Sequence, residues 1–144
     1  GALIVDLPPE EAGPYLEAAR KVDLETIFLA SPTTSDARLA LVDAASSGFV
    51  YYISRLGVTG ESERISDSLE AELARVRRGV SRRLAVGFGI STPEQAAAAG
   101  RNADAVVVGS ALVKFAERHP PEEAARRMGE FARTLVAALA KQED

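Results

Sequence analysis

The chain alternates between short, continuous apolar runs and longer segments in which apolar residues recur every three or four positions. The short runs are rich in β-branched and aromatic residues and scarcely alternate in polarity, which is typical of parallel strands buried on both faces. We therefore predict five strands, at residues 2–7, 26–30, 49–54, 84–86 and 103–108.

The segments between these runs have helical periodicity. The clearest has an apolar stripe formed by Leu69, Leu73, Val76 and Val80. Asp67 and Glu70 resemble a capping box and predict the beginning of this helix, and Gly79 predicts its end. Two further helices are predicted, one beginning near Ser35 and one at Pro121.

The resulting order is five successive β-α units within a single domain, residues 1–144, with right-handed crossovers expected throughout. Such an order fits an open, doubly wound five-stranded sheet. It also fits part of a parallel (β/α)8 TIM barrel, which has eight strands and about 250 residues. Periodicity does not choose between them. Because a strand begins at the second residue, we expect that earlier units of a barrel precede it.

Composition narrows the classes of function. With 17 basic and 21 acidic residues the net charge is −4, which predicts no general affinity for nucleic acid or acidic membranes. Without cysteine, and with His119 as its single histidine, the chain offers little for a metal site or a histidine-based triad. The lack of cysteine is compatible with the reducing cytoplasm, where we expect the protein to reside.

Glycine follows three of the predicted strands, where the chain leaves the sheet. The third strand is followed by Gly57 and Gly60, the fourth by the 87–89 Gly-Phe-Gly segment, and the fifth by Gly109 and Ser110. Glycine lets bare backbone amides approach a ligand, and amides near a helix N-terminus bind anions. Ser110 is expected to cap a short helix over residues 111–115. Barrel enzymes often bind phosphate with the loops after strands seven and eight, so we interpret the last two strands as these.

Other side chains near the strand ends are candidates for chemistry. Phe88 stands between two glycines and offers an aromatic face beside the anion site. Tyr51 and Tyr52 must point to opposite faces of their strand, so only one can face the ligand. Asp6, at the end of the first strand, is the best general base that the residues offer, and Thr59 is a hydroxyl suited to orienting another group.

In combination, the segments LIVDLPPEE, GFVYYISRLGVTG, AVGFGISTPEQ and VVVGSALVK closely resemble the tryptophan synthase alpha chain over essentially all 144 residues. The resemblance implies a TIM barrel that cleaves indole-3-glycerol phosphate to indole and glyceraldehyde 3-phosphate by a retro-aldol reaction, a lyase step of tryptophan biosynthesis. It implies no cofactor in this subunit, and an α2β2 complex with a beta chain that carries pyridoxal phosphate.

The resemblance also assigns residues by motif position. It implies a phosphate cradle of Gly60, Gly89, Gly109 and Ser110. It implies an indole pocket walled by Phe88, Tyr51 and Leu3. Thr59 matches a loop threonine that orients a catalytic aspartate, and Asp6 matches an auxiliary aspartate rather than the principal acid or base.

The family's principal catalytic glutamate and aspartate lie on and after the second barrel strand, which has no counterpart in this sequence. We therefore expect the chain to supply strands four to eight and to be inactive, or nearly so, by itself. Two other interpretations stay open: a noncatalytic fragment that binds a phosphate ester or regulates a partner, and another phosphate-binding TIM-barrel enzyme. Because half a barrel exposes two sheet edges, we expect either a longer protein or self-association of two copies.

Overall fold

The computed structural model describes the chain except for residues 55–61, 88 and 141–144, and it describes residues 62–68 by their backbone. The strands are β1 (Ala2–Leu3), β2 (Thr26–Ala30), β3 (Phe49–Ile53), β4 (Arg83–Gly87) and β5 (Ala105–Val107). The helices are the 3-10 turn η1 (Pro9–Glu11), α1 (Gly13–Lys21), α2 (Asp36–Ala45), α3 (Ser62–Gly79), α4 (Pro93–Gly100), α5 (Ser110–Glu117) and α6 (Pro121–Ala140). This confirms the alternating β/α order.

All five strands are parallel, and their order in the sheet is the order in the sequence, β1-β2-β3-β4-β5. A doubly wound sheet reverses its strand order at a switch point, so the described sheet does not match that alternative. Continuous winding in one direction is the arrangement of strands in a β/α barrel. The fold is therefore α/β with five parallel strands.

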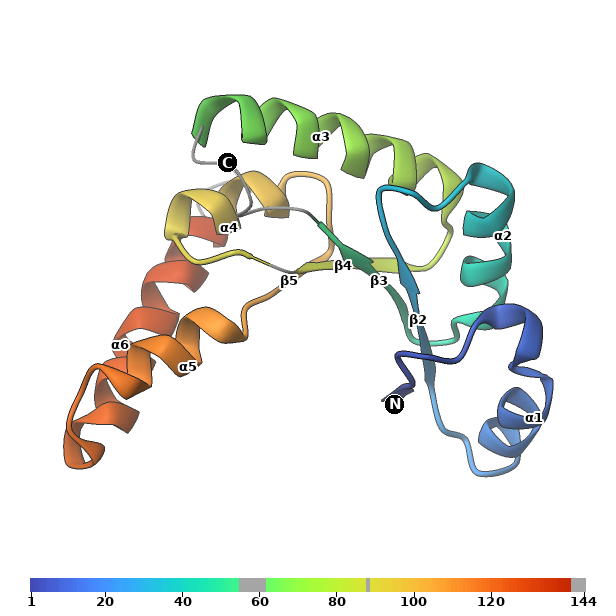
Figure 1. Cartoon of the computed structure of the whole chain (residues 1–144), viewed down its shortest axis with the longest axis horizontal. Coiled ribbons are helices and arrows are strands. Elements are labelled where there is room, and N and C mark those ends of the chain that lie inside the picture. Colours follow the sequence, from blue (N-terminus) through green and yellow to red (C-terminus); the bar gives the residue numbers. More distant parts are fainter. Residues whose placement is uncertain (55–61, 88, 141–144) are drawn as a thin grey trace.

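One face of the sheet is covered by helices, which Figure 1 shows along one side of the strands. Val50 and Tyr52 of β3 and Leu84 and Val86 of β4 are fully buried on this face. They pack in one core with the stripes of α2 and α3, which include Leu39, Val42, Leu69, Leu73 and Val76. The apolar stripe predicted for α3 is thus confirmed as a core-facing surface.

The opposite face, which we call the open face, has no helix layer over it in the described chain. Alternation along the strands places on it Leu3, Ile27, Leu29, Phe49, Tyr51, Ile53, Ala85, Gly87, Ala105 and Val107. None of these residues belongs to the hydrophobic core cluster. The core therefore lies between the sheet and its helices, as in the outer layer of a barrel.

Three elements differ from the sequence-based expectations. β1 was expected to span residues 2–7 but ends at Leu3, because residues 5 and 6 form a turn closed by the Leu7 amide on the Ile4 carbonyl. β5 is also shorter than expected, at three residues. The beginning expected for α3 at Asp67 is wrong: the helix begins at Ser62, so the capping-box pattern lies inside it.

Polar groups close the end of the sheet where the strands begin. Asp43 of α2 accepts hydrogen bonds from the Ser81 and Arg82 amides at 2.9 Å and from the Ser81 hydroxyl at 2.7 Å. Asp104 accepts from the Leu84 amide at 2.7 Å and from Arg77 at 2.8 Å. These carboxylates join helix ends to strand β4, which indicates a stabilising role at this end of the sheet.

Candidate functional site

The glycine-bearing strand ends lie side by side at one edge of the sheet. The register pairs Ile53 with Gly87 and Gly87 with Val107, so β3, β4 and β5 reach this edge at the same level. Ser54, fully buried, fixes the first two ends: its amide and its hydroxyl both donate to the Gly87 carbonyl at 2.9 Å. Gly89 and Gly109 each follow two residues after the paired positions Gly87 and Val107, so they hold equivalent places in the loops after neighbouring strands.

The loop after β4 needs glycine for its backbone. Gly89 has a φ of 83°, in the left-handed region that other residues rarely adopt. Gly109 has an ordinary φ of −114°, and a β-carbon added to it would meet no atom within 4 Å. Glycine at position 109 is therefore not required by packing in the described chain, and the space beside it is open to a ligand.

Helix α5 begins at Ser110, with Gly109 in the N-cap position and no side chain capping it. The expectation that Ser110 caps this helix is therefore wrong, because Ser110 is already its first helical residue. The Leu112 and Val113 amides donate to the Gly109 carbonyl at 2.9 and 3.2 Å. That leaves the Ser110 and Ala111 amides as available donors at the positive end of the helix dipole, with an exposed Ser110 hydroxyl beside them.

Tyr51 and Tyr52 point to opposite faces, as expected from strand alternation. Tyr52 is fully buried under the helices and its hydroxyl donates to Glu72 at 2.8 Å. Tyr51 is half-buried on the open face, where burial raises the pKa of its hydroxyl. Leu3 shares that face through its pairing with Ile27, so the structure brings two of the predicted indole-pocket residues to one surface.

Three candidate residues, Phe88, Thr59 and Gly60, lie outside the described residues. Asp6 is exposed and lies in the turn that follows β1, not in the strand as expected. It lines a cavity of about 310 Å³ together with Leu7, Phe28, Leu29 and Arg38. Asp6 therefore stands at the strand-end side of the sheet, beside β1 and β2 rather than beside the glycine ends.

Arg38 is a residue of this region that the sequence reasoning missed. It sits in the first turn of α2, where the helix dipole disfavours a cation. Its guanidinium pairs with Glu10 of η1, which joins the loop after β1 to the beginning of α2. Both side chains are about half exposed, so the pair contributes roughly 0–1 kcal/mol. An arginine in the first turn of a predicted helix is unfavourable, and this could have indicated from the sequence that Arg38 has an acidic partner.

No group of three or more potential metal ligands comes together within the described residues. Among the described helices, none is long and apolar enough to cross a membrane. What the described edge offers chemically is a set of backbone amides, a hydroxyl and an adjoining apolar face. This combination suits a ligand with an anionic end and a flat apolar end.

The chain was compared with known proteins. The family model for "Tryptophan synthase alpha chain" matches residues 1–140. The tryptophan synthase alpha chain of Pelobacter propionicus is 47% identical over 139 residues, covering 96% of this chain and 52% of that protein. The alpha chain of Thermococcus kodakarensis is 44% identical over 135 residues, covering 92% of this chain and 54% of the relative.

Solved structures agree with the sequence relatives. The tryptophan synthase alpha subunit of Legionella pneumophila superposes with a TM-score of 0.82 at 32% identity, covering 96% of this chain and 51% of that one. A chain of the α2β2 tryptophan synthase complex of Pyrococcus furiosus gives a TM-score of 0.77 at 36% identity, covering 94% and 54%. This chain spans about half the length of the relatives it matches. By sequence and by fold, it belongs to the tryptophan synthase alpha chain family.

Proposed function

We propose that this chain is the substrate-holding part of a tryptophan synthase alpha chain, corresponding to barrel strands four to eight. The reaction is the cleavage of indole-3-glycerol phosphate to indole and glyceraldehyde 3-phosphate. The observation that supports the proposal is the level register of β3, β4 and β5, in which Ile53, Gly87 and Val107 are aligned a few residues before Gly89, Gly109 and Ser110. Backbone amides gathered there can hold the phosphate.

The role of each residue follows from the chemistry of the substrate. The phosphate is dianionic and takes the amides and hydroxyl of Ser110, with Gly60 and Gly89 completing the cradle. The indole is flat and apolar and takes Tyr51, Leu3 and Phe88. Anchoring both ends fixes the bond to be broken between them, because a substrate held in one orientation loses less entropy at the transition state.

Cleavage also needs proton transfers, one to C3 of the indole and one from the glycerol hydroxyl. Asp6 and Thr59 serve as auxiliary and orienting groups, and the principal glutamate and aspartate lie outside this sequence. The family uses no cofactor in the alpha chain, and pyridoxal phosphate belongs to the beta subunit. We propose the beta chain as the partner of this protein, in the manner of the α2β2 complex solved for Pyrococcus furiosus.

A noncatalytic role in binding phosphate esters is the second candidate. The observation that favours it is that the described part of the sheet edge offers amides and a hydroxyl but only Asp6 as a carboxylate following a strand. The two candidates share the same binding site, and they differ in whether the proton transfers of cleavage take place there.

Calorimetric titration with indole-3-glycerol phosphate, and with its dephosphorylated analogue indole-3-glycerol, tests the site common to both. We expect the phosphate ester to bind at least about tenfold more tightly, a difference of about 1.4 kcal/mol. Equal affinities would contradict a phosphate site. Binding of glycerol 3-phosphate as tight as that of the full substrate would contradict the indole pocket.

A further inference from the structure

Helix α5 carries the Ser110 and Ala111 amides that we assign to the phosphate, and its own contacts with the fold are few. None of its residues is buried in the described structure, and Val113 is 57% exposed. The strand before it, β5, has only three residues. Among the described elements, α5 packs mainly against α6. The position of its N-terminal amides therefore depends on the contact between α5 and α6.

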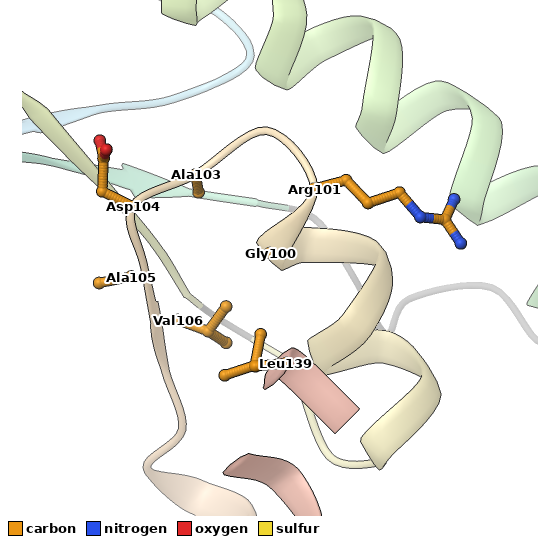
Figure 2. Close-up of a pocket in the computed structure, with 7 residues that line it drawn as sticks. All are labelled: Gly100, Arg101, Ala103, Asp104, Ala105, Val106 and Leu139. Atoms are coloured by element: carbon orange, nitrogen blue, oxygen red, sulfur yellow. The ribbon is translucent and has the colours of Figure 1, made fainter. Parts of the chain in front are cut away.

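Helix α6 is itself attached to the core of the molecule. Its Leu135 is buried there, and the helix packs along α4. Figure 2 shows Leu139 of α6 beside Val106 of β5, where both side chains line a cavity of about 320 Å³. Phe131, one turn before Leu135, packs against the same core. Helix α6 is thus a fixed support for α5.

Three rings join the two helices. The Phe115 ring of α5 stacks on the Phe131 ring of α6, with the centroids 4.9 Å apart and the planes at 8°. The imidazole of His119, just after α5, lies with its centroid 4.6 Å from that of Phe115 and its plane at 31°. Aromatic rings stack in a few preferred geometries, so such contacts fix orientation as well as distance. We call these three residues the aromatic cluster.

The backbone at the end of α5 is tied to the same cluster. His119 Nδ1 lies 2.7 Å from the Phe115 carbonyl oxygen. A carbonyl oxygen only accepts, so this hydrogen bond requires the proton on Nδ1. The same carbonyl accepts from the Arg118 amide at 3.3 Å. Pro120 and Pro121 follow, and each has a nearly fixed φ. The turn between the two helices is therefore short and constrained.

We propose that the aromatic cluster positions α5 for the phosphate, so that Phe131 and His119 set the affinity for the phosphate end of the substrate without contacting it. The inference rests on the proposed function for the identity of the ligand. Phe115 stands about 7.5 Å along the helix from Ser110, at about 1.5 Å per residue. A tilt of the helix at Phe115 therefore displaces the N-terminal amides, and hydrogen bonds weaken steeply as their geometry is lost.

Phe131→Leu tests the proposal, because it removes the stacked ring and keeps an apolar side chain. Calorimetric titrations use glycerol 3-phosphate for one end of the substrate and indole-3-glycerol for the other. We expect binding of glycerol 3-phosphate to weaken at least about fivefold and binding of indole-3-glycerol to change by less than about twofold. Phe131→Tyr keeps the ring and should restore the affinity. Equal losses for the two ligands, or no loss for glycerol 3-phosphate, would overturn the proposal.

The matched control is Val136→Ala, because Val136 lies on the same helix and is 64% exposed. It should leave both affinities unchanged. For His119, Gln keeps a donor for the Phe115 carbonyl without the ring, and Phe keeps the ring without the donor. Both His119→Gln and His119→Phe should weaken glycerol 3-phosphate binding less than His119→Ala does. Unchanged binding in His119→Ala would remove His119 from the cluster.

Hydrogen exchange measures the position of α5 without any ligand. The Leu112 and Val113 amides donate to the Gly109 carbonyl at 2.9 and 3.2 Å. In Phe131→Leu, they should exchange at least about tenfold faster, while the amides of β3 and β4 keep their rates. Unchanged exchange in α5 would overturn the inference whatever the ligands do. A parent chain that binds neither ligand, together with faster α5 exchange in the variant, would instead sink the proposed function and leave the cluster as the support of α5.

Discussion

The hydroxyl of Tyr51 occupies the place where a β-carbon of Gly87 would stand. The two residues lie on neighbouring strands. Tyr51 is paired with Ala85, and its ring reaches past that residue to Gly87, two residues further along β4. An added β-carbon at Gly87 would also lie 3.0 Å from Tyr51 Cζ and 3.1 Å from Val107 Cβ. The missing side chain at Gly87 is therefore what lets the Tyr51 hydroxyl reach the end of β4, beside the candidate site.

Gly87→Ala is expected to destabilise the chain by about 1–3 kcal/mol, the usual range for overpacking a filled site. Combining it with Tyr51→Phe should recover part of this loss, because the clashing hydroxyl is gone while the ring and Val107 remain close. Urea denaturation of both single variants and the double variant measures the coupling. Gly109→Ala is the control, since its β-carbon meets nothing within 4 Å. Strictly additive effects of the two substitutions would contradict the contact.

Tyr51 should also be visible in an alkaline titration. Burial raises the pKa of its hydroxyl above the ordinary value of 10.0, because the phenolate is poorly solvated on the open face. The raised folded-state pKa means that the stability contributed by neutral Tyr51 is complete below pH 10.0 and is lost as the pH rises through the folded-state pKa. Ultraviolet absorbance should show a late phenolate transition, and Tyr51→Phe should lower its amplitude by one phenolate. A late transition whose amplitude this substitution leaves unchanged would contradict the contribution of Tyr51.

Asp43 gives a second pH dependence at the opposite end of the sheet. Burial tends to raise the pKa of its carboxyl, but hydrogen bonds from the Ser81 side chain and the Arg82 and Ser81 amides outweigh burial and hold it below 3.8. The stability from ionised Asp43 is present above pH 3.8 and is lost as the pH falls through the folded-state pKa. Asp43→Asn should cost about 1–2 kcal/mol at neutral pH. Acid denaturation curves that separate above pH 3.8 and converge only once the pH has fallen below the folded-state pKa would agree with this sign.

The sequence predicted some of these structural features and missed others. Continuous apolar runs placed β2, β3 and β4 to within a residue or two, because buried parallel strands leave a strong local signal. The apolar runs predicted β1 and β5 to be longer than they are. These two strands lie at the sides of the sheet and have one neighbouring strand each, so an apolar residue there need not be paired within a strand. The contact between Tyr51 and Gly87 had no local signal at all, because it depends on the register between strands.

The candidate site, too, was predictable from the sequence only where the signal was local. Glycine after three of the strands indicated a candidate ligand edge, since parallel strands end on one side of a sheet, and the register aligns Ile53, Gly87 and Val107 where β3, β4 and β5 end. The ligand itself stays a prediction. The cap assigned to Ser110 was wrong, because sequence alone does not say whether Gly109 or Ser110 is the first residue outside the helix. Arg38 escaped notice because its partner, Glu10, is 28 residues away.

A negative charge introduced by substitution at the beginning of α5 tests the proposed phosphate site. Ser110→Asp places a carboxylate beside the amides that we assign to the phosphate and should weaken binding of indole-3-glycerol phosphate at least about tenfold, by like-charge repulsion. Val113→Asp adds the same charge to the same helix at a residue 57% exposed, and it should change affinity far less. Because an acidic residue suits the first turn of a helix, Ser110→Asp should not lower stability. Equal losses of affinity in both variants would remove the phosphate from this position.

The catalytic consequence is the last prediction. If the principal acid and base lie on the half of the barrel that this sequence does not match, the chain alone should bind indole-3-glycerol phosphate without cleaving it, since each missing proton transfer typically costs about 10²–10⁴-fold in rate. Adding the part of the Pelobacter propionicus alpha chain that lies outside the 139 matched residues should restore the release of indole, which is measured by indole fluorescence. In this mixture Ser110→Asp should lower turnover through a raised KM. Steady-state cleavage by the unaccompanied chain would show that its own residues, with Asp6 foremost, supply the proton transfers.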